Sequence, residues 1–466
     1  MQHKFNPSVL REYDIRGIVD ETLNADDARA LGRAFGTKII RSGGKHVCVG
    51  YDGRHSSPVF CTALIDGLVS TGIHVENIGL GPTPMLYFAV KDRQADGGIM
   101  ITGSHNPSSY NGFKMTLQHE PIFGEAILAL GDIAAQGDFE TGTGSVEQID
   151  IQDNYVARLV QDLSADNRPL NIVWDNGNGA AGEILRRLTA KLPGKHQLLF
   201  DDIDGDFPNH HPDPTVDANL VDLQQAVLKG GYDMGIAFDG DGDRIGVIDE
   251  TGAILRCDAL MTIYAKEVLS RHPGVAIIGD VKCSQVMFDE IKRLGGKPIM
   301  WKTGHSLVKA KMSEENAPLA GELSGHIFFK DGYYGFDDAL YCAVRLINCA
   351  SAVGAPFSSL SAHLPQLFNT PEMRIDVAEE GKFDLVPQIF EWVQGQNNPD
   401  FQLSDIDGLR VSTPDGWWLM RPSNTQNAIV CRAEANSQAA LNDMIKMIEQ
   451  AFALVGYNYN FKKEGS

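Results

Sequence analysis

The chain repeats one pattern three times: an apolar strand ends at an aspartate, and a short polar turn then leads into a helix. The strands are His46–Gly50, which is followed by Asp52, then Asn171–Asp175 and Val275–Asp280. Short apolar runs that alternate with helical stretches are typical of parallel β-strands joined by helices. The repeats therefore predict an α/β fold built from three diverged units with mixed sheets.

Within the first unit the spacing of apolar residues also predicts the individual helices and strands. It predicts helices over Asp26–Ile40 and Ser57–Ser70, and strands over Ile73–Ile78 and Gly97–Ile101. The glycines at 177–182 lack the full G-x-G-x-x-G spacing of a dinucleotide-binding turn. We interpret them as a tight turn between a strand and a helix.

Each unit also contains a later strand that runs into a polar loop. These loops are Thr102–Pro107, Phe238–Arg244 and Gly321–His326. Open α/β sheets bind ligands outside the carboxyl ends of their strands. The three loops are therefore expected to converge on one site.

A length of 466 residues exceeds what one hydrophobic core supports. We expect α/β domains over 1–150, 151–253 and 254–367, with polar junctions at Gly142–Ile151 and Leu364–Glu372. Residues 368–466 read as a smaller α+β domain that ends in a helix over Gln438–Leu454.

The net charge and the cysteine pattern exclude several classes of partner and of cellular compartment. A formal net charge of -21 argues against nucleic-acid and membrane partners. The charge does not exclude an anionic small molecule as the ligand, provided that a few arginines and lysines are concentrated at its binding site. The seven scattered cysteines lack a CxxC pair, the N-terminus lacks an apolar signal core, and no run is long enough to span a membrane. These features predict reduced thiols and a cytoplasmic protein.

Ser104 lies in a sharp turn between Gly103 and His105, directly after a strand. Backbone amides around such a turn can bind an anion, and a hydroxyl presented there is a candidate phosphoryl or acyl acceptor. The alternative is that Ser104 only caps the next segment, as serines in turns often do.

Asp239, Asp241 and Asp243 alternate with glycines between two apolar runs. Carboxylates this close repel one another unless a cation neutralises them, and oxygen ligands select a hard ion, Mg²⁺ first. Arg244 beside them could hold a phosphoryl oxygen. The alternatives are a solvated hairpin turn and an EF-hand loop with Glu250 as its twelfth residue. The EF-hand fits poorly, because Arg244 stands where glycine is required and the flanking segments read as strands.

Two further loops carry binding chemistry. If the loop at 322–326 is extended, Glu322, Ser324 and His326 face one side and suit a polyhydroxylated ligand. Arg421–Thr425 combines a guanidinium, hydroxyls and an amide in a turn, which suits a phosphate dianion. Plain polar surface turns are the alternative in both places.

Five strings, YDIRG, TGSHNP, DGDGDR, GELSGH and RPSNT, occur in an order that closely resembles the α-D-phosphohexomutases. The likeness is greatest to the bacterial phosphomannomutase/phosphoglucomutase branch and extends from about residue 9 to the final helix. It implies four domains around a central cleft, three of them related α/β units.

The resemblance also implies roles for individual residues. Ser104 would be the phosphoserine, and one of its oxygens together with Asp239, Asp241 and Asp243 would hold Mg²⁺. The positions expected near the transferred group are Arg16, His105, Lys114 and Arg244. The positions expected to bind the substrate are Tyr13, Lys282, His305, Glu322, Ser324, His326, Arg421, Ser423, Asn424 and Thr425.

The reaction implied is reversible interconversion of hexose 6-phosphate and hexose 1-phosphate, of mannose or glucose, through a hexose 1,6-bisphosphate. His105, Lys114 and His326 are all candidates for the general base, and a monomer is expected. Gln426 and Asn427 replace the acidic residue and proline that many relatives carry there. Alternatives are a phosphoglucosamine mutase, which typically reads GEQSGH and SGT, a Mg²⁺-dependent phosphatase that uses the same serine, and a sugar-phosphate binding protein without catalysis.

Overall fold

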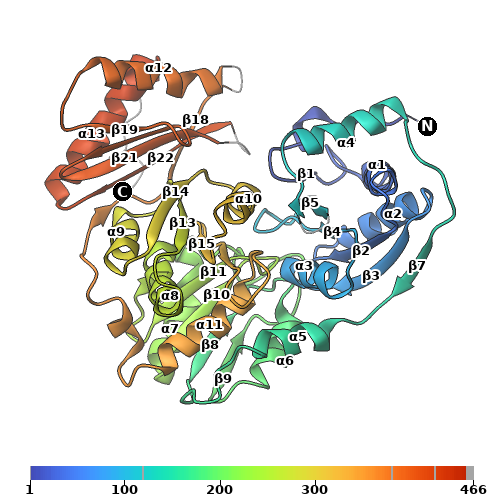
Figure 1. Ribbon diagram of the computed structural model, residues 1–466, viewed down its shortest axis with the longest axis horizontal. Coiled ribbons are helices and arrows are strands. Elements are labelled where there is room, and N and C mark those ends of the chain that lie inside the picture. The colour runs from blue at the N-terminus through green and yellow to red at the C-terminus, as the bar shows by residue number, and fades with distance from the viewer. Residues whose placement is uncertain (1, 118–119, 379–380, 424–426, 458–466) are drawn as a thin grey trace.

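The computed structural model describes residues 2–117, 120–378, 381–423 and 427–457. Its β-strands form four sheets, which follow one another in chain order (Figure 1). The first sheet and the last lie at opposite sides of the view, and the second and third lie between them (Figure 1).

The first sheet has the strand order β1-β5-β4-β2-β3-β7, and β6 pairs with β5. Strands β2, β3, β4 and β7 are parallel, whereas β5 is antiparallel to β4 and β1 is antiparallel to β5. The strands are β1 (Ile15–Ile18), β2 (His46–Tyr51), β3 (His74–Leu80), β4 (Gly97–Ile101), β5 (Tyr110–Leu117), β6 (Glu120–Pro121) and β7 (Ser145–Gln148).

The second and third sheets repeat part of this order. In each sheet three parallel strands are followed by one antiparallel strand: β9-β8-β10-β11 and β14-β13-β15-β16 match β3-β2-β4-β5. The prediction of three related α/β units is therefore confirmed. Their strands are β8 (Ile172–Asp175), β9 (His196–Leu199), β10 (Met234–Phe238), β11 (Ile245–Asp249), β12 (Ile254–Leu255), β13 (Ala276–Asp280), β14 (Lys297–Trp301), β15 (Leu319–Gly321) and β16 (Ile327–Phe329).

The fourth sheet is antiparallel and has a core of its own. Its order is β17-β22-β21-β20-β19, and β18 also pairs with β22. Helices α12 (Lys382–Gly395) and α13 (Gln438–Leu454) pack on it. Its strands are β17 (Phe368–Asn369), β18 (Met373–Asp376), β19 (Gln402–Ser404), β20 (Leu409–Thr413), β21 (Gly416–Pro422) and β22 (Ala428–Ala435).

Strand alternation divides the first unit between two cores. Val47 and Val49 face one core, which α1 (Ala25–Arg41), α2 (Ser57–Val69) and α4 (Glu125–Gln136) cover. Cys48, between them, faces α3 (Thr83–Asp92) and a second core that continues through the second and third units. The first three units are therefore held together by one continuous apolar interior.

The remaining helices belong to the second and third units. They are α5 (Gln152–Val160), α6 (Gly182–Thr189), α7 (Val221–Gly230), α8 (Cys257–Arg271), α9 (Gln285–Arg293), α10 (His305–Glu315) and α11 (Ala339–Ser351). Short 3₁₀ turns occur at Pro7–Val9, Asp217–Leu220 and Phe357–Leu360. No helix in the described part of the chain combines the length and apolar character that a membrane crossing needs.

The predicted elements of the first unit lie within one or two residues of the observed ones, and α13 has its predicted bounds. All seven cysteines are free and six are buried, which confirms the thiol prediction. The two polar junctions, in contrast, contain short strands. All four residues of β7 are exposed, so this edge strand has no apolar alternation to reveal it. Strand β17 consists of two exposed residues, Phe368 and Asn369.

The continuous core leads to a stability prediction. Phe88 on α3 is 2% exposed, and its ring lies 5.5 Å from that of Tyr155 on α5. We expect Phe88→Ala to lower the free energy of unfolding by about 3–5 kcal/mol, because it leaves a cavity between two units. The control is Phe383→Ala on α12, where the side chain is 57% exposed and the loss should stay below about 0.5 kcal/mol. Equal losses in urea unfolding would contradict a shared core.

Candidate functional site

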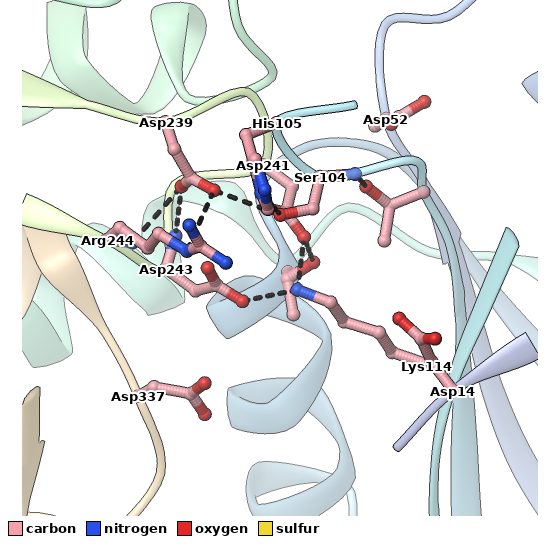
Figure 2. A network of polar contacts seen from close by, with 12 residues as sticks. Asp14, Asp52, Ser104, His105, Lys114, Asp239, Asp241, Asp243, Arg244 and Asp337 are labelled. Atoms are coloured by element: carbon pink, nitrogen blue, oxygen red, sulfur yellow. Dashed lines mark hydrogen bonds and ion pairs between the residues drawn. The ribbon is translucent and has the colours of Figure 1, made fainter. Parts of the chain in front are cut away.

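Three loops at equivalent places in the three units form the site. Each joins the last parallel strand of a unit to its antiparallel strand: residues 102–109 follow β4, 239–244 follow β10, and 322–326 follow β15. Ser104 Oγ donates to Asp239 Oδ2 at 3.1 Å. Arg244 and His326 form an antiparallel bridge. The predicted convergence of the loops is therefore confirmed, and Figure 2 shows the first two meeting.

Ser104 is buried and its backbone is in the left-handed region, with φ of +49°. Its amide donates to Thr102 Oγ1 at 2.8 Å, and its hydroxyl lies 3.2 Å from His105 Nδ1. A Cβ atom on Gly240 would lie 2.5 Å from the Ser104 carbonyl oxygen. The glycine therefore allows the serine loop and the aspartate loop to approach this closely.

The three aspartates are buried, and one carboxylate oxygen from each lies within 4.8 Å of the other two. Asp239 Oδ1 accepts from the amides of Asp243 and Arg244, both at 3.1 Å. Burial raises the pKa of Asp239 well above its ordinary value, and the charges of Asp243 and Asp241 raise it further. Oδ1 of Asp241 and of Asp243 accepts no hydrogen bond from the described residues. Such a donor set fits a hard divalent cation.

Two groups of the first unit reach across to this cluster. Lys114 Nζ on β5 donates to Asp241 Oδ2 at 2.7 Å and to Asp243. Burial alone would lower the pKa of Lys114, but the charges of Asp241 and Asp243 hold it well above its ordinary value. Thr83, the first residue of α3, donates its hydroxyl to Asp241 Oδ2 at 2.5 Å. Lys114 therefore stays charged and compensates part of the acidic cluster.

Arg16 and His105 lie on the serine side of the site. Arg16 Nη1 donates to Asn106 Oδ1 at 2.8 Å, and its Nη2 pairs with Asp14. Desolvation lowers the pKa of His105 well below its ordinary value, and the charges of Arg244 and Arg16 add to this effect. His105 is therefore neutral near pH 7 and can accept a proton.

His326 connects the second and third loops. Its Nε2 accepts from Arg244 Nε at 3.0 Å, so the ring proton belongs on Nδ1, which lies 3.1 Å from Asp337 Oδ2. Lys309 Nζ donates to Asp337 Oδ1 at 2.9 Å, and His305 Nδ1 lies 4.0 Å from Oδ2. Asp337 and Lys309 were missed by sequence reasoning, because they lie outside the polar loops and no local pattern marks them.

The segment at 322–326 is a turn, so the prediction of an extended loop is wrong. Gly325 has φ of +95°, and the Glu322 amide donates to the His326 carbonyl oxygen at 2.8 Å. Glu322 Oε1 accepts from the Gly304 amide at 2.7 Å, and its Oε2 accepts from Ser324 Oγ at 3.0 Å. Glu322 and Ser324 thus lie together, while His326 faces Arg244.

Residues 303–304, between β14 and α10, touch three units. The Thr303 carbonyl oxygen accepts from Tyr13 Oη at 2.8 Å, and its amide donates to Asp407 Oδ2 at 3.0 Å. Arg421 Nε donates to the same Asp407 oxygen at 2.8 Å. Tyr13 and Arg421, which are far apart in sequence, are therefore connected through Thr303 and Asp407.

The remaining predicted positions are placed as follows. Lys282 Nζ donates to Glu372 Oε2 at 3.0 Å, between the third and fourth sheets. The Ser423 amide donates to the Ala428 carbonyl oxygen at 2.8 Å. Asn424 and Thr425 lie outside the described residues. Arg54 and Asp52, which were not singled out as site residues, lie beneath the Ser104 loop.

Comparison with known proteins agrees with this arrangement. Four phosphoglucomutase/phosphomannomutase family models match in order: α/β/α domain I over residues 8–140, domain II over 153–252, domain III over 256–368 and the C-terminal domain over 372–451. A phosphomannomutase/phosphoglucomutase of Pseudomonas putida is 45% identical over 93% of this chain and 93% of its own length. A phosphoglucomutase of Neisseria gonorrhoeae is 42% identical over 93% of this chain and 94% of its own. A phosphoglucomutase/phosphomannomutase family protein from Burkholderia thailandensis has a solved structure with a TM-score of 0.91 and 44% identity, covering 98% of this chain and 99% of that one.

The acidic cluster leads to a metal-binding prediction. We expect Asp241→Asn to weaken Mg²⁺ binding by about tenfold or more, because one of the three negative charges is lost. Isothermal titration with MgCl₂ measures the affinity directly. Asp258→Asn is the matched control, because Asp258 is a buried aspartate of the third unit that contacts the Ser284 amide. Equal Mg²⁺ affinity in Asp241→Asn and wild type would contradict the assignment.

Proposed function

The chain belongs to the α-D-phosphohexomutase family, in the bacterial phosphomannomutase/phosphoglucomutase branch, and from this premise we propose that Ser104 carries the phosphoryl group that is transferred. The protein is a hexose-phosphate mutase that interconverts hexose 6-phosphate and hexose 1-phosphate. The names of its relatives do not favour the phosphatase or phosphoglucosamine mutase alternatives.

The contact between Ser104 and the acidic cluster is the observation that carries the proposal. Ser104 Oγ donates to Asp239 at 3.1 Å, so an ion held by the three aspartates would lie next to any phosphate on this serine. Mg²⁺ would be held by Asp239, Asp241, Asp243 and a phosphoserine oxygen. When bound, it would offset negative charge on the phosphoryl group.

Transfer proceeds in two steps of the same kind. A free sugar hydroxyl attacks the phosphorus of phosphoserine 104, the bond from phosphorus to Ser104 Oγ breaks, and a hexose 1,6-bisphosphate forms. The bisphosphate then presents its other phosphate to Ser104 Oγ, and the reverse displacement releases the isomeric monophosphate. The bisphosphate is thus both the intermediate and the compound that rephosphorylates a free Ser104.

Charge and proton transfer are assigned to groups around Ser104. Arg16, Lys114 and Arg244 neutralise the phosphoryl oxygens. Lys114 Nζ donates to both Asp241 and Asp243, so Lys114 is assigned the role of a cation. Because His326 Nε2 already accepts from Arg244 and its Nδ1 faces Asp337, the base that takes the hydroxyl proton is assigned to His105.

The third and fourth units bind the rest of the substrate. Glu322 and Ser324, which lie together in the turn, would accept and donate hydrogen bonds to sugar hydroxyls. Arg421, oriented by Asp407, would hold the phosphate that is not transferred, with Ser423, Asn424 and Thr425. Tyr13, Lys282 and His305 would also bind the substrate.

We also propose the finer organisation of the protein. The domains divide at residues 1–150, 151–253, 254–367 and 368–466, near the limits of the four family matches. The protein acts as a cytoplasmic monomer on mannose or glucose phosphates.

Removal of the acceptor hydroxyl tests the proposal. We expect Ser104→Ala to lower kcat by about a thousandfold or more, because it removes the hydroxyl that accepts the phosphoryl group. Phosphorus NMR of glucose 1-phosphate and mannose 1-phosphate with Mg²⁺ and a trace of hexose 1,6-bisphosphate follows both isomers. Ser109→Ala, at an exposed serine of the same loop, should retain wild-type kcat. Near-normal turnover by Ser104→Ala would refute the assignment.

Loss of the phosphate ligand should appear in KM. Arg421→Ala is expected to raise KM about 10- to 100-fold for both the 1-phosphate and the 6-phosphate, because the same group binds either phosphate in turn. Steady-state kinetics in both directions measure this. Arg293→Ala, which removes an arginine paired with Glu290 on α9, is the control. A change in KM for only one isomer would contradict a shared phosphate site.

A further inference from the structure

Arg54 lies beneath the Ser104 loop with its side chain buried, and every N–H group of its guanidinium has an acceptor. Nε donates to Asp52 Oδ2 at 3.1 Å. Nη1 donates to the carbonyl oxygens of Pro107 at 2.6 Å and Tyr110 at 3.0 Å. Nη2 donates to those of Ser104 at 2.8 Å and Asn106 at 2.6 Å. Because no donor is left over, Arg54 has none to offer a substrate.

Asp52 connects this guanidinium to the rigid part of the first unit. It directly follows β2, and its Oδ2 also accepts from the Gly103 amide at 3.1 Å. Its Oδ1 accepts from the Arg54 amide at 3.1 Å and from Ser57 Oγ, at the start of α2, at 2.6 Å. The pair of Asp52 and Arg54 thus ties the loop from 103 to 110 to a strand and a helix.

The conformation of the loop explains why an arginine is needed. With Ser104 in the left-handed region, the carbonyl oxygens of residues 104, 106, 107 and 110 all turn toward one point. Buried carbonyl groups require donors. Only the planar fork of arginine offers four terminal N–H groups at once, whereas lysine offers three from a single nitrogen.

The second unit covers Arg54 from outside. The ring centroid of Phe207 lies 5.3 Å from Arg54 Cζ. A Cβ atom on Gly53 would lie 2.3 Å from Ile203 Cγ2, so this segment packs directly on the backbone next to Arg54. Arg54 therefore contacts both the Ser104 loop of the first unit and the second unit, which also carries Asp239.

We propose that Arg54, held by Asp52, is a positioning residue for phosphoryl transfer: it fixes the backbone of the 103–110 loop so that Ser104 Oγ faces the acidic cluster. The inference rests on the proposed function of Ser104. It assigns Arg54 no contact with the sugar phosphate, so its loss should affect the chemical step and not substrate binding.

The test is Arg54→Lys, which keeps the charge but removes the fork. We expect kcat to fall about a hundredfold, as displacement of a reacting group by about 1 Å costs, while KM changes less than about threefold. Hydrogen exchange of the amides of residues 102–110 should become faster, with exchange elsewhere unchanged. The matched control is Arg345→Lys, which changes a buried arginine of α11 bound to Asp331 and should leave kcat and the loop's exchange as in wild type.

A second variant keeps the test decisive if Arg54→Lys fails to fold. The Asp52 carboxylate accepts four hydrogen bonds, two at each oxygen. In Asp52→Asn one of these oxygens becomes an NH₂ group, which would face two hydrogen-bond donors. This variant should reproduce the loss of kcat at unchanged KM and the faster exchange at 102–110. A folded Arg54→Lys or Asp52→Asn with kcat within threefold of wild type would overturn the proposal, and so would a loss that appears only in KM. Full activity of Ser104→Ala would instead refute the proposed function, so the two failures are distinguishable.

Discussion

Three buried carboxylates within 4.8 Å of one another are the constraint on which the rest of the structure depends. Such an arrangement is stable only if positive charge and hydrogen-bond donors reach it from outside its own loop. The backbone amides of Asp243 and Arg244 supply donors from within the loop, and the donors from outside it come from the first unit, through Lys114 and the hydroxyl of Thr83. The acidic cluster therefore requires the first and second units to be in close contact. The same contact brings Ser104 to it.

The repeated unit explains how three distant segments come to one place. In each unit the site loop joins the last parallel strand to the antiparallel one, at the carboxyl edge of the sheet. An aspartate at the end of β2 or β13 supports this edge: Asp52, which follows β2, accepts from the Gly103 amide, and Asp280, the last residue of β13, accepts from the Leu323 amide at 3.3 Å. In the second unit Asp175 pairs with His210 and the Gly177 amide instead. The unit is thus a scaffold whose loop chemistry differs from copy to copy.

Much of this could be read from the sequence, because it depends on local pattern. Apolar runs in the sequence predicted β4, β10 and β13. The polar loops that follow strands pointed to Ser104 and the three aspartates. What could not be read depends on contacts between residues that are far apart in sequence. Arg54, Thr83, Lys309 and Asp337 act through partners that strand register and helix docking bring near. The turn at Gly325 shows a second limit, since one glycine at positive φ changes which side chains face each other.

The central claim is that the phosphate on Ser104 is the one that the sugar receives, and a single-turnover chase tests it most directly. Enzyme labelled with radioactive phosphate by hexose 1,6-bisphosphate, freed of excess label, is mixed with unlabelled glucose 1-phosphate and Mg²⁺ and quenched at successive times. The account predicts that label leaves a peptide spanning residues 102–110 and appears in hexose phosphates, with little free phosphate. Label on a peptide without Ser104, or release mainly as inorganic phosphate, would contradict it.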